Sequence, residues 1–195
     1  MYDVIGGVEN RTFRVLWAME EMGLDYTFHK SKMHSETVAS LNPSGKVPIL
    51  KVEGKPITDS SAIMQYLADK HDKLTYKAGT IERAQQDSLH FQIIDEIDAV
   101  LWVATRHSFT LPEERRVPEV KESLRWEFGL NIARIADKLG DQEFLMGDKM
   151  TVPDIILCHC LSWARSAKFD VPHDNLSAYG KRLRGRKAYA KAAAN

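Results

Sequence analysis

Cysteine is scarce in this chain of 195 residues, which contains only Cys158 and Cys160. Both cysteines fall in a segment of helical spacing, where side chains two residues apart point about 200° away from each other. Such a pair suits neither a disulfide nor two ligands of one metal ion. We therefore predict two buried thiols in a core helix and no metal site.

The sequence also lacks an excess of charge of one sign and any long hydrophobic run. Lys plus Arg and Asp plus Glu number 27 each, so no net charge attracts nucleic acid or an acidic membrane. The basic stretch 181–187 is short and fits a solvated helix face. No run of eighteen apolar residues is present, which argues against a membrane span. The first residues do not resemble a signal peptide, and we expect a cytoplasmic protein with neither nucleic-acid nor membrane partners.

Strand and helix patterns alternate in the first part of the chain. Residues 2–6 read as a strand, Thr12 opens a helix that stops at Gly23, and residues 24–29 alternate as a second strand. Strand, helix and strand within thirty residues form a βαβ unit, which requires a parallel strand pair and a right-handed crossover. The polar stretch 31–41 is predicted to be partly helical.

Only helix signals remain after the first eighty residues. One long helix is predicted at about 82–107 and another at about 118–139, and the rest is helical apart from a break at Pro172. The fold class is therefore α/β plus all-α. We place the first domain at 1–72, a linker at 73–80 and an all-α domain at 81–195.

The stretch 42–63 is the most informative part of the sequence. A turn at 42–45 leads into Val47-Pro48-Ile49-Leu50, where a proline suits either the first residue of a strand or a cis bond. A hairpin follows with its turn near Gly54, and then Asp59 and Ser60 offer capping groups before a helical pattern.

This stretch can recognise an amino acid at both of its ends. If Val47 precedes a cis proline, its N–H and C=O face outward and are ready for a peptide-like ligand. The helix start at Ser60 supplies a hydroxyl, N–H groups and partial positive charge for a carboxylate, and Asp59 can accept a hydrogen bond from an ammonium group. The alternative interpretation is an ordinary hairpin followed by a capped helix.

Gly-Lys-Val-Pro-Ile-Leu at 45–50, followed by Thr-Asp-Ser-Ser-Ala-Ile at 58–63, resembles the glutathione site of the cytosolic glutathione S-transferase superfamily. The resemblance implies an N-terminal thioredoxin-like βαβ–ββα domain, a C-terminal helical bundle, glutathione as co-substrate and a homodimer. It also assigns contacts with glutathione. The residues so assigned are Lys46, Val47, Pro48, Asp59 and Ser60.

Asp59 and Lys46 have particular roles among these assigned contacts. The family more often has Glu where this chain has Asp59, which has a shorter reach. Lys46 would pair with the glycyl carboxylate, as a basic or amide residue does in relatives.

A third stretch, Thr151-Val152-Pro153-Asp154, resembles the capping signature of the buried helix in the second domain, and its predicted role is folding.

The usual group that activates the thiol is missing. Family members place Ser, Tyr or Cys between the first strand and the first helix, and none occurs at 6–15. Three substitutes remain: the amide N–H₂ of Asn10, the charge of Arg11 and the hydroxyl of Thr12 near a helix N-terminus. As an alternative, Asn10 and Thr12 are ordinary capping residues. Glu9 is expected to point away from the thiolate or to bind the substrate amine.

The resemblance leads to a predicted function and two alternatives. We expect a detoxifying glutathione transferase that joins the thiolate to a small hydrophobic electrophile, with Trp102, Arg106 and His107 in the electrophile pocket. Aromatic residues at helical spacing are also common in cores. The alternatives are a glutathione-dependent peroxidase or isomerase, and a non-catalytic protein that binds glutathione or another ligand. The absence of a cysteine in 6–15 argues against disulfide exchange.

Overall fold

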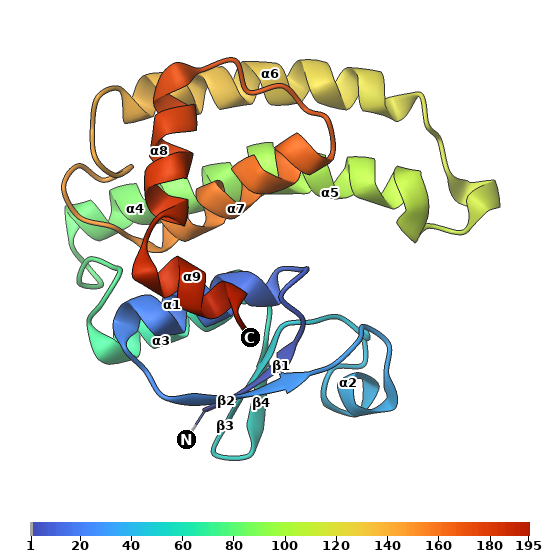
Figure 1. The fold of residues 1–195 in the computed structure, drawn as a ribbon, viewed down its shortest axis with the longest axis vertical. Coiled ribbons are helices and arrows are strands. Elements are labelled where there is room, and N and C mark those ends of the chain that lie inside the picture. The colour runs from blue at the N-terminus through green and yellow to red at the C-terminus, as the bar shows by residue number, and fades with distance from the viewer. Residues whose placement is uncertain (1) are drawn as a thin grey trace. The chain divides into compact units, whose positions relative to one another are not determined.

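The structure, a computed structural model, describes residues 2–195, which form two compact units (Figure 1). The first unit contains the residues up to Thr80 together with Arg184–Asn195, and the second contains Ile81–Leu183. The sequence pattern predicts 184–195 as part of the all-α domain, whereas these residues group with the first unit in the structure.

A four-stranded mixed sheet forms the centre of the first unit. Its strands follow the order β2-β1-β3-β4, with β1 and β2 parallel and the other two pairings antiparallel. Pro56 lies in β4, an edge strand, where the missing N–H costs no ladder hydrogen bond. The strands are β1 (Tyr2–Gly6), β2 (Tyr26–Lys30), β3 (Ile49–Val52) and β4 (Lys55–Thr58).

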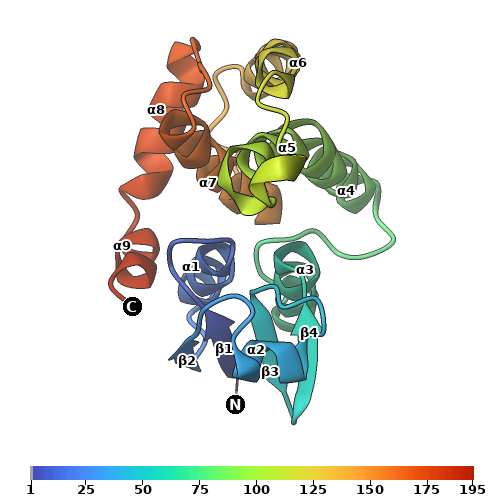
Figure 2. The ribbon, with the colours of Figure 1, turned by 90° about the vertical axis from the view of Figure 1, so that its right-hand side faces the viewer.

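Helices cover both faces of this sheet. Ile5 pairs with Ile49, and both pack against Val38 of α2, while the neighbouring pair Val4 and Leu50 points to the opposite face. Figure 2 shows α1 and α3 side by side on that opposite face, with α2 across the sheet. This arrangement confirms the predicted thioredoxin-like domain. The helices are α1 (Thr12–Met22), α2 (Glu36–Leu41), α3 (Ser60–His71) and α9 (Lys187–Ala193).

Helix α9 belongs to the first unit because its side chains pack on α1. The Tyr189 ring lies edge-on to Phe13 and Trp17, with ring centroids 4.9 and 5.0 Å away. Arg186, just before α9, forms a two-pronged ion pair with Glu21 at 2.7 and 2.8 Å. These contacts join residues at least 165 positions apart in the chain, so no local pattern could reveal them.

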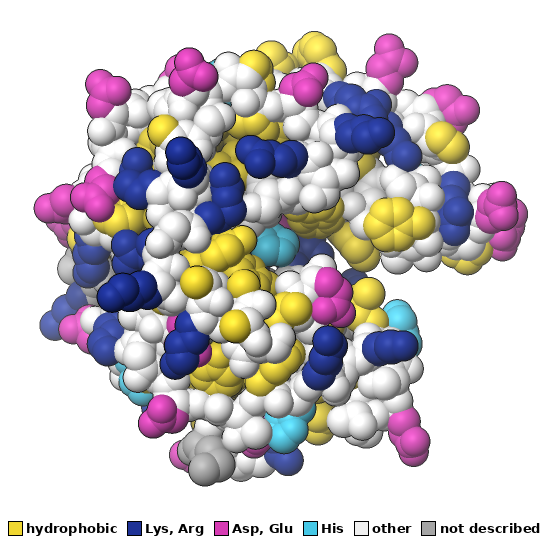
Figure 3. Space-filling model, viewed as in Figure 1, with side chains coloured by type: hydrophobic (Ala, Val, Ile, Leu, Met, Phe, Trp, Pro, Cys, Tyr) yellow, Lys and Arg dark blue, Asp and Glu magenta, His cyan; other side chains and the backbone are white. Residues whose placement is uncertain are grey.

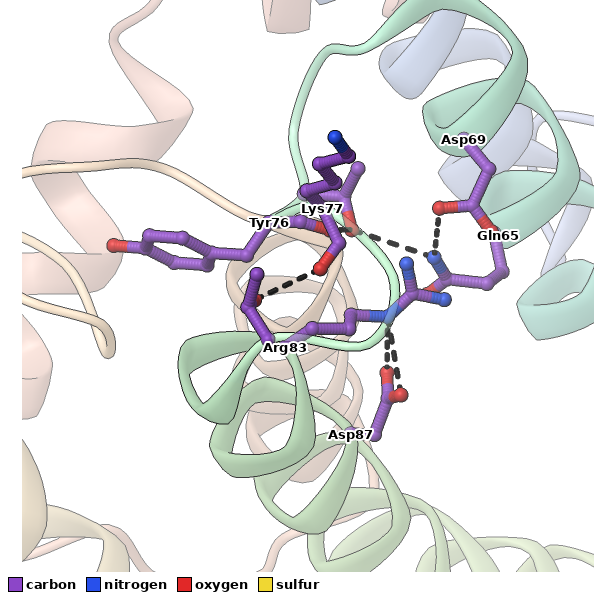
Figure 4. Close-up of polar contacts among 8 residues, drawn as sticks. Gln65, Asp69, Tyr76, Lys77, Arg83 and Asp87 are labelled. Carbon is purple, nitrogen blue, oxygen red and sulfur yellow. Dashed lines mark hydrogen bonds and ion pairs between the residues drawn. The ribbon is translucent and has the colours of Figure 1, made fainter.

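The expected linker is ordered within the first unit. Gln65 Nε2 of α3 donates to Asp69 at 3.2 Å and to Thr75 Oγ1 at 3.4 Å, and Thr80 Oγ1 donates to the main-chain oxygen of Lys77 at 2.8 Å (Figure 4). Hydrogen bonds therefore join this connector to α3 and also stabilise its own turns.

The second unit is all-helical, as predicted. The long helix expected at 82–107 is a continuous helical run over 81–110, in which two π-helical segments interrupt the α-helix. Its elements are α4 (Ile81–Ile93), η1 (Ile94–Asp98), α5 (Ala99–Thr105), η2 (Arg106–Thr110), η3 (Glu113–Arg115), α6 (Val120–Leu139), α7 (Val152–Ser166) and α8 (Asp174–Arg184).

Helix α7 is the core of the second unit and has the predicted cap. Asp154 accepts hydrogen bonds from the main-chain N–H of Thr151 and of Leu145, and from the hydroxyls of Thr151 and Tyr179. Burial raises the pKa of Asp154, and burial beside this carboxylate raises the pKa of Tyr179, so the tyrosine stays protonated and donates. The contribution of Tyr179 was not apparent from the sequence.

Both cysteines lie in α7 as buried thiols without a disulfide, as predicted. Cys160 Sγ lies 3.7 Å from Asp98 Oδ2. Over residues 2–195, no helix combines the length and the apolar character needed to cross a membrane. Figure 3 shows Lys and Arg side chains over α8 and α9, where the exposed basic residues Lys181, Arg182 and Lys187 occur.

Candidate functional site

The Val47–Pro48 peptide bond is cis, as the sequence suggested. The β1–β3 ladder ends at the pair Ile5 and Ile49, so Val47 lies beyond the sheet. Within the described residues, neither the N–H nor the C=O of Val47 hydrogen-bonds to another residue. A donor and an acceptor on one half-buried residue therefore remain for an extended peptide.

The loop that presents Val47 is held by Asn42 and His34. Asn42 Nδ2 donates to the main-chain oxygen of Lys46 at 2.9 Å, and its Oδ1 accepts from the N–H and the hydroxyl of Ser44. A Cβ on Gly45, at φ +69°, would come within 2.0 Å of the His34 ring, so only glycine fits there. The turn at 42–45 was predicted from the sequence, but the packing of the His34 ring over Gly45 was not. The Lys46 side chain is exposed.

Asp59 begins helix α3 in an unusual backbone conformation. Its φ is 73°, a region that residues other than glycine seldom adopt, and its Oδ1 accepts from the N–H groups of Ser61 and Ala62 at 2.8 and 3.2 Å. Within residues 2–195, Oδ2 makes no hydrogen bond, and the side chain is exposed. Asp59 thus caps the helix and keeps one carboxylate oxygen available for a cation. Ser60, the first residue of α3, is 3% exposed.

The loop between β1 and α1 brings Asn10 and Thr12 together. The Thr12 N–H and hydroxyl both donate to Asn10 Oδ1, at 2.9 and 2.7 Å. Asn10 is half-buried, whereas Thr12 is fully buried. The Thr12 hydroxyl proton is already used in this bond, whereas the N–H₂ group of the Asn10 amide makes no hydrogen bond within residues 2–195. Arg11, between them, is half-buried.

Glu9, in the same loop, has an exposed side chain whose carboxylate lies over Gly7. A Cβ on Gly7 would come within 2.3 Å of a Glu9 carboxylate oxygen. The carboxylate therefore folds back along its own loop.

The three residues predicted for the electrophile pocket belong to the second unit. Trp102 lies on α5 and is half-buried, while Arg106 and His107 begin η2. His107 Nδ1 accepts a hydrogen bond from the N–H of Val117 at 3.0 Å, so the imidazole helps to hold the segment after η2. Arg106 is exposed.

Family models and relatives of known sequence were compared with this chain. The family models of the glutathione S-transferase N-terminal and C-terminal domains match residues 11–70 and 97–187. Glutathione S-transferase GstA of Escherichia coli O157:H7 is 24% identical over 175 residues, which are 85% of this chain and 84% of that protein. Elongation factor 1-gamma 2 of Oryza sativa subsp. japonica is 24% identical over 164 residues, which are 78% of this chain and 37% of that protein.

A solved structure shows the same fold. A sphingomonad glutathione S-transferase complexed with glutathione has a TM-score of 0.85 and 23% identity, covering 98% of this chain and 97% of that one. The two family models together span most of this chain. The N-terminal model lies within the first unit, and the C-terminal model lies mostly within the second. The chain therefore belongs to the cytosolic glutathione S-transferase superfamily.

Proposed function

We propose that this protein is a glutathione transferase that joins glutathione to a small hydrophobic electrophile. The observation that carries this proposal is the Val47 main chain, which has no hydrogen-bond partner among residues 2–195 and lies beside the cis Pro48. The cysteinyl part of glutathione would pair with this N–H and C=O as an added strand. The complex between a sphingomonad relative and glutathione supports the choice of tripeptide.

The remaining contacts follow from charge. The γ-glutamyl carboxylate would bind the N-terminus of α3 at Ser60, and the γ-glutamyl ammonium would bind the open Oδ2 of Asp59. The exposed Lys46 would meet the glycyl carboxylate. The opposite charges of Asp59 and Lys46 would thereby fix the direction of the bound tripeptide.

The sulfur would lie against Asn10 and Arg11. A free thiol has a pKa of about 8.5, so a hydrogen bond and positive charge that lower this pKa raise the thiolate fraction at neutral pH. In the reaction, a bond forms between sulfur and carbon while the bond between carbon and the leaving group breaks. The leaving group departs with the electron pair, and the thiol proton passes to water.

Turnover of chloro-dinitrobenzene by purified protein tests this proposal. We expect glutathione-dependent chloride displacement, and we expect Asn10→Ala to lower kcat/KM by about tenfold because one hydrogen bond to the thiolate is lost. Lys30→Ala, an exposed change on β2, is the control. Activity that is equal in Asn10→Ala and the wild type would contradict the role of Asn10.

A second candidate is a protein that binds glutathione without catalysing transfer. Two observations favour it: residues 6–15 contain no Ser, Tyr or Cys, and one relative is elongation factor 1-gamma 2. Calorimetric binding of glutathione without turnover of the electrophile, of a peroxide or of an isomerisation substrate would support this candidate. Turnover of a peroxide alone would support a glutathione peroxidase.

We also propose a cytoplasmic, detoxifying homodimer in which Trp102, Arg106 and His107 contact the electrophile. Phe91 on α4 is 69% exposed, and a subunit contact would bury this apolar ring. Sedimentation analysis is expected to give a dimer for the wild type and a shift towards monomer for Phe91→Asp. A monomeric wild type would exclude the homodimer.

A further inference from the structure

The orientation of the Asn10 side-chain amide is dictated by its neighbour. The amide oxygen and nitrogen are hard to tell apart by shape, and their assignment must come from hydrogen bonds. Here the main-chain N–H of Thr12, which can only donate, lies 2.9 Å from the Asn10 side-chain atom assigned as Oδ1. That atom must be the acceptor, and so the other end of the amide is the N–H₂ donor.

The Thr12 hydroxyl reinforces this orientation. It donates to the same oxygen at 2.7 Å, the shorter of the two bonds. The hydroxyl is held over Gly6, where a Cβ would come within 2.0 Å of Thr12 Oγ1, so a side chain at position 6 would displace it. Thr12 is fully buried, which keeps water from competing for its hydroxyl proton.

The Asn10 N–H₂ group is consequently the end of the amide that is open to a ligand. Within residues 2–195 it makes no hydrogen bond, since both bonds of this side chain go to its oxygen. An amide nitrogen donates but neither accepts a hydrogen bond nor ionises near neutral pH. A thiolate is favoured opposite such a donor, and it would be opposed if the amide turned its oxygen outward.

We propose that Thr12 is a positioning residue that keeps the Asn10 N–H₂ group directed at the glutathione sulfur. This inference rests on the proposed function. Thr12 acts through Asn10 and does not touch the sulfur. The site stabilises the thiolate by hydrogen bonding and contains no group that takes up the thiol proton. The pH dependence of the reaction therefore follows the ionisation of the bound thiol.

The test measures the pKa of enzyme-bound glutathione from the ultraviolet absorbance of the thiolate as a function of pH. Thr12→Val keeps the shape of the side chain and removes the hydroxyl that donates to Asn10, so it is expected to raise the pKa of the bound thiol. The rise is expected to be only about 0.5 to 1 unit, because the main-chain N–H of residue 12 still holds the Asn10 amide. Thr12→Ser retains the hydroxyl and is expected to restore the wild-type value. The affinity for S-methylglutathione, which lacks the thiol proton, is expected to stay unchanged in both variants.

The outcomes separate this inference from the proposed function. If wild-type protein shows no heat with glutathione in calorimetry, the proposed function fails, and the inference fails with it. If wild-type protein binds glutathione but a folded Thr12→Val variant has the wild-type thiol pKa, only the inference is overturned. If Thr12→Val does not fold, the inference is tested by the nuclear magnetic resonance signals of the Asn10 side-chain amide in the wild type. They are expected to shift with glutathione, and unchanged resonances would overturn the inference.

Discussion

At the scale of single residues, Asp59 combines two roles on its two carboxylate oxygens. Oδ1 satisfies two main-chain N–H groups at the start of α3, while Oδ2 is open, within the described residues, for a cation. The positive φ of 73° stores backbone strain, which is typical of functional positions. Asparagine tolerates this backbone region and caps helices as well as aspartate does, so the two roles can be separated by experiment.

Asp59→Asn is expected to weaken glutathione binding roughly tenfold or more while leaving the free energy of unfolding within about 0.5 kcal/mol. The cap survives, but the charge that would bind the ammonium group is lost. Calorimetry and urea unfolding give the two quantities. Asp72→Asn, at the positive-φ position that ends the same helix, is the matched control and should leave the affinity unchanged. Equal affinity in wild type and Asp59→Asn would remove Asp59 from the site.

Tyr26 provides a prediction at alkaline pH. Burial, together with the hydrogen bond from its hydroxyl to Glu20, raises the pKa of Tyr26 to about 12. The folded protein therefore keeps this proton between pH 10 and 12, whereas an unfolded tyrosine loses it near the lower value. Because the folded state binds more protons there, this group's contribution to stability falls as the pH rises through that range.

An alkaline titration of tyrosinate absorbance checks this pKa. We expect one component near pH 12 in the wild type and its absence in Tyr26→Phe. A Tyr26→Phe titration that superposes on the wild-type curve would show that the hydroxyl ionises elsewhere.

At the scale of elements, the start of α7 shows how local sequence and distant packing combine. Thr151 and Asp154 form the reciprocal cap predicted from their spacing, and Tyr179, 25 positions later, adds a donor at 2.8 Å. The carboxylate thus satisfies four donors in a buried environment. A buried donor that loses its acceptor costs free energy, which makes this cap a stability determinant.

Asp154→Ala is expected to lower the free energy of unfolding by about 3 kcal/mol or more, because buried N–H groups of Thr151 and Leu145 lose their acceptor. Asp148→Ala, an exposed change in the preceding turn, should stay within about 0.5 kcal/mol. Urea unfolding measures both variants. Similar losses in the two would mean that the cap contributes little.

At the scale of the whole molecule, the chain returns to the first unit at its end. Arg186 pairs with Glu21, which also accepts from Trp17 Nε1 at 2.9 Å, and Lys191 pairs with Glu20 at 2.7 Å. The pair at Glu21 is partly buried and two-pronged, which makes it stronger than a surface pair. The thioredoxin-like unit therefore depends on residues that follow the whole helical unit in sequence.

Tyr189→Ala is expected to destabilise the protein by about 2 kcal/mol, because the ring leaves a gap against Phe13 and Trp17. Hydrogen exchange should be faster at the amides of α1 than in the wild type, while the amides of α7 in the second unit serve as an internal reference. Lys187→Ala, an exposed change on the same helix, is the control. Unchanged exchange in α1 would argue against this role of α9.

The sequence by itself determined the elements that have local signals. Gly23 ends α1 in the left-handed region as expected, the hairpin turns at Gly54, and the cap on α7 follows from two residues three positions apart. The cis bond before Pro48 was one of the two conformations that the sequence indicated for this proline. Each depends on backbone preferences or side-chain bonds between near neighbours, which a sequence shows directly.

Only the tertiary structure decided which groups are already used. The hydroxyl of Thr12, a predicted thiol contact, donates to Asn10 Oδ1, and the assignment of the N–H₂ end of the Asn10 amide follows from that bond. The place of 184–195 depends on contacts with α1 that no local pattern shows, because Arg186 and Glu21 lie about 165 positions apart. Hydrogen bonding and burial depend on the three-dimensional neighbourhood, and for these residues that neighbourhood is set by the folded chain.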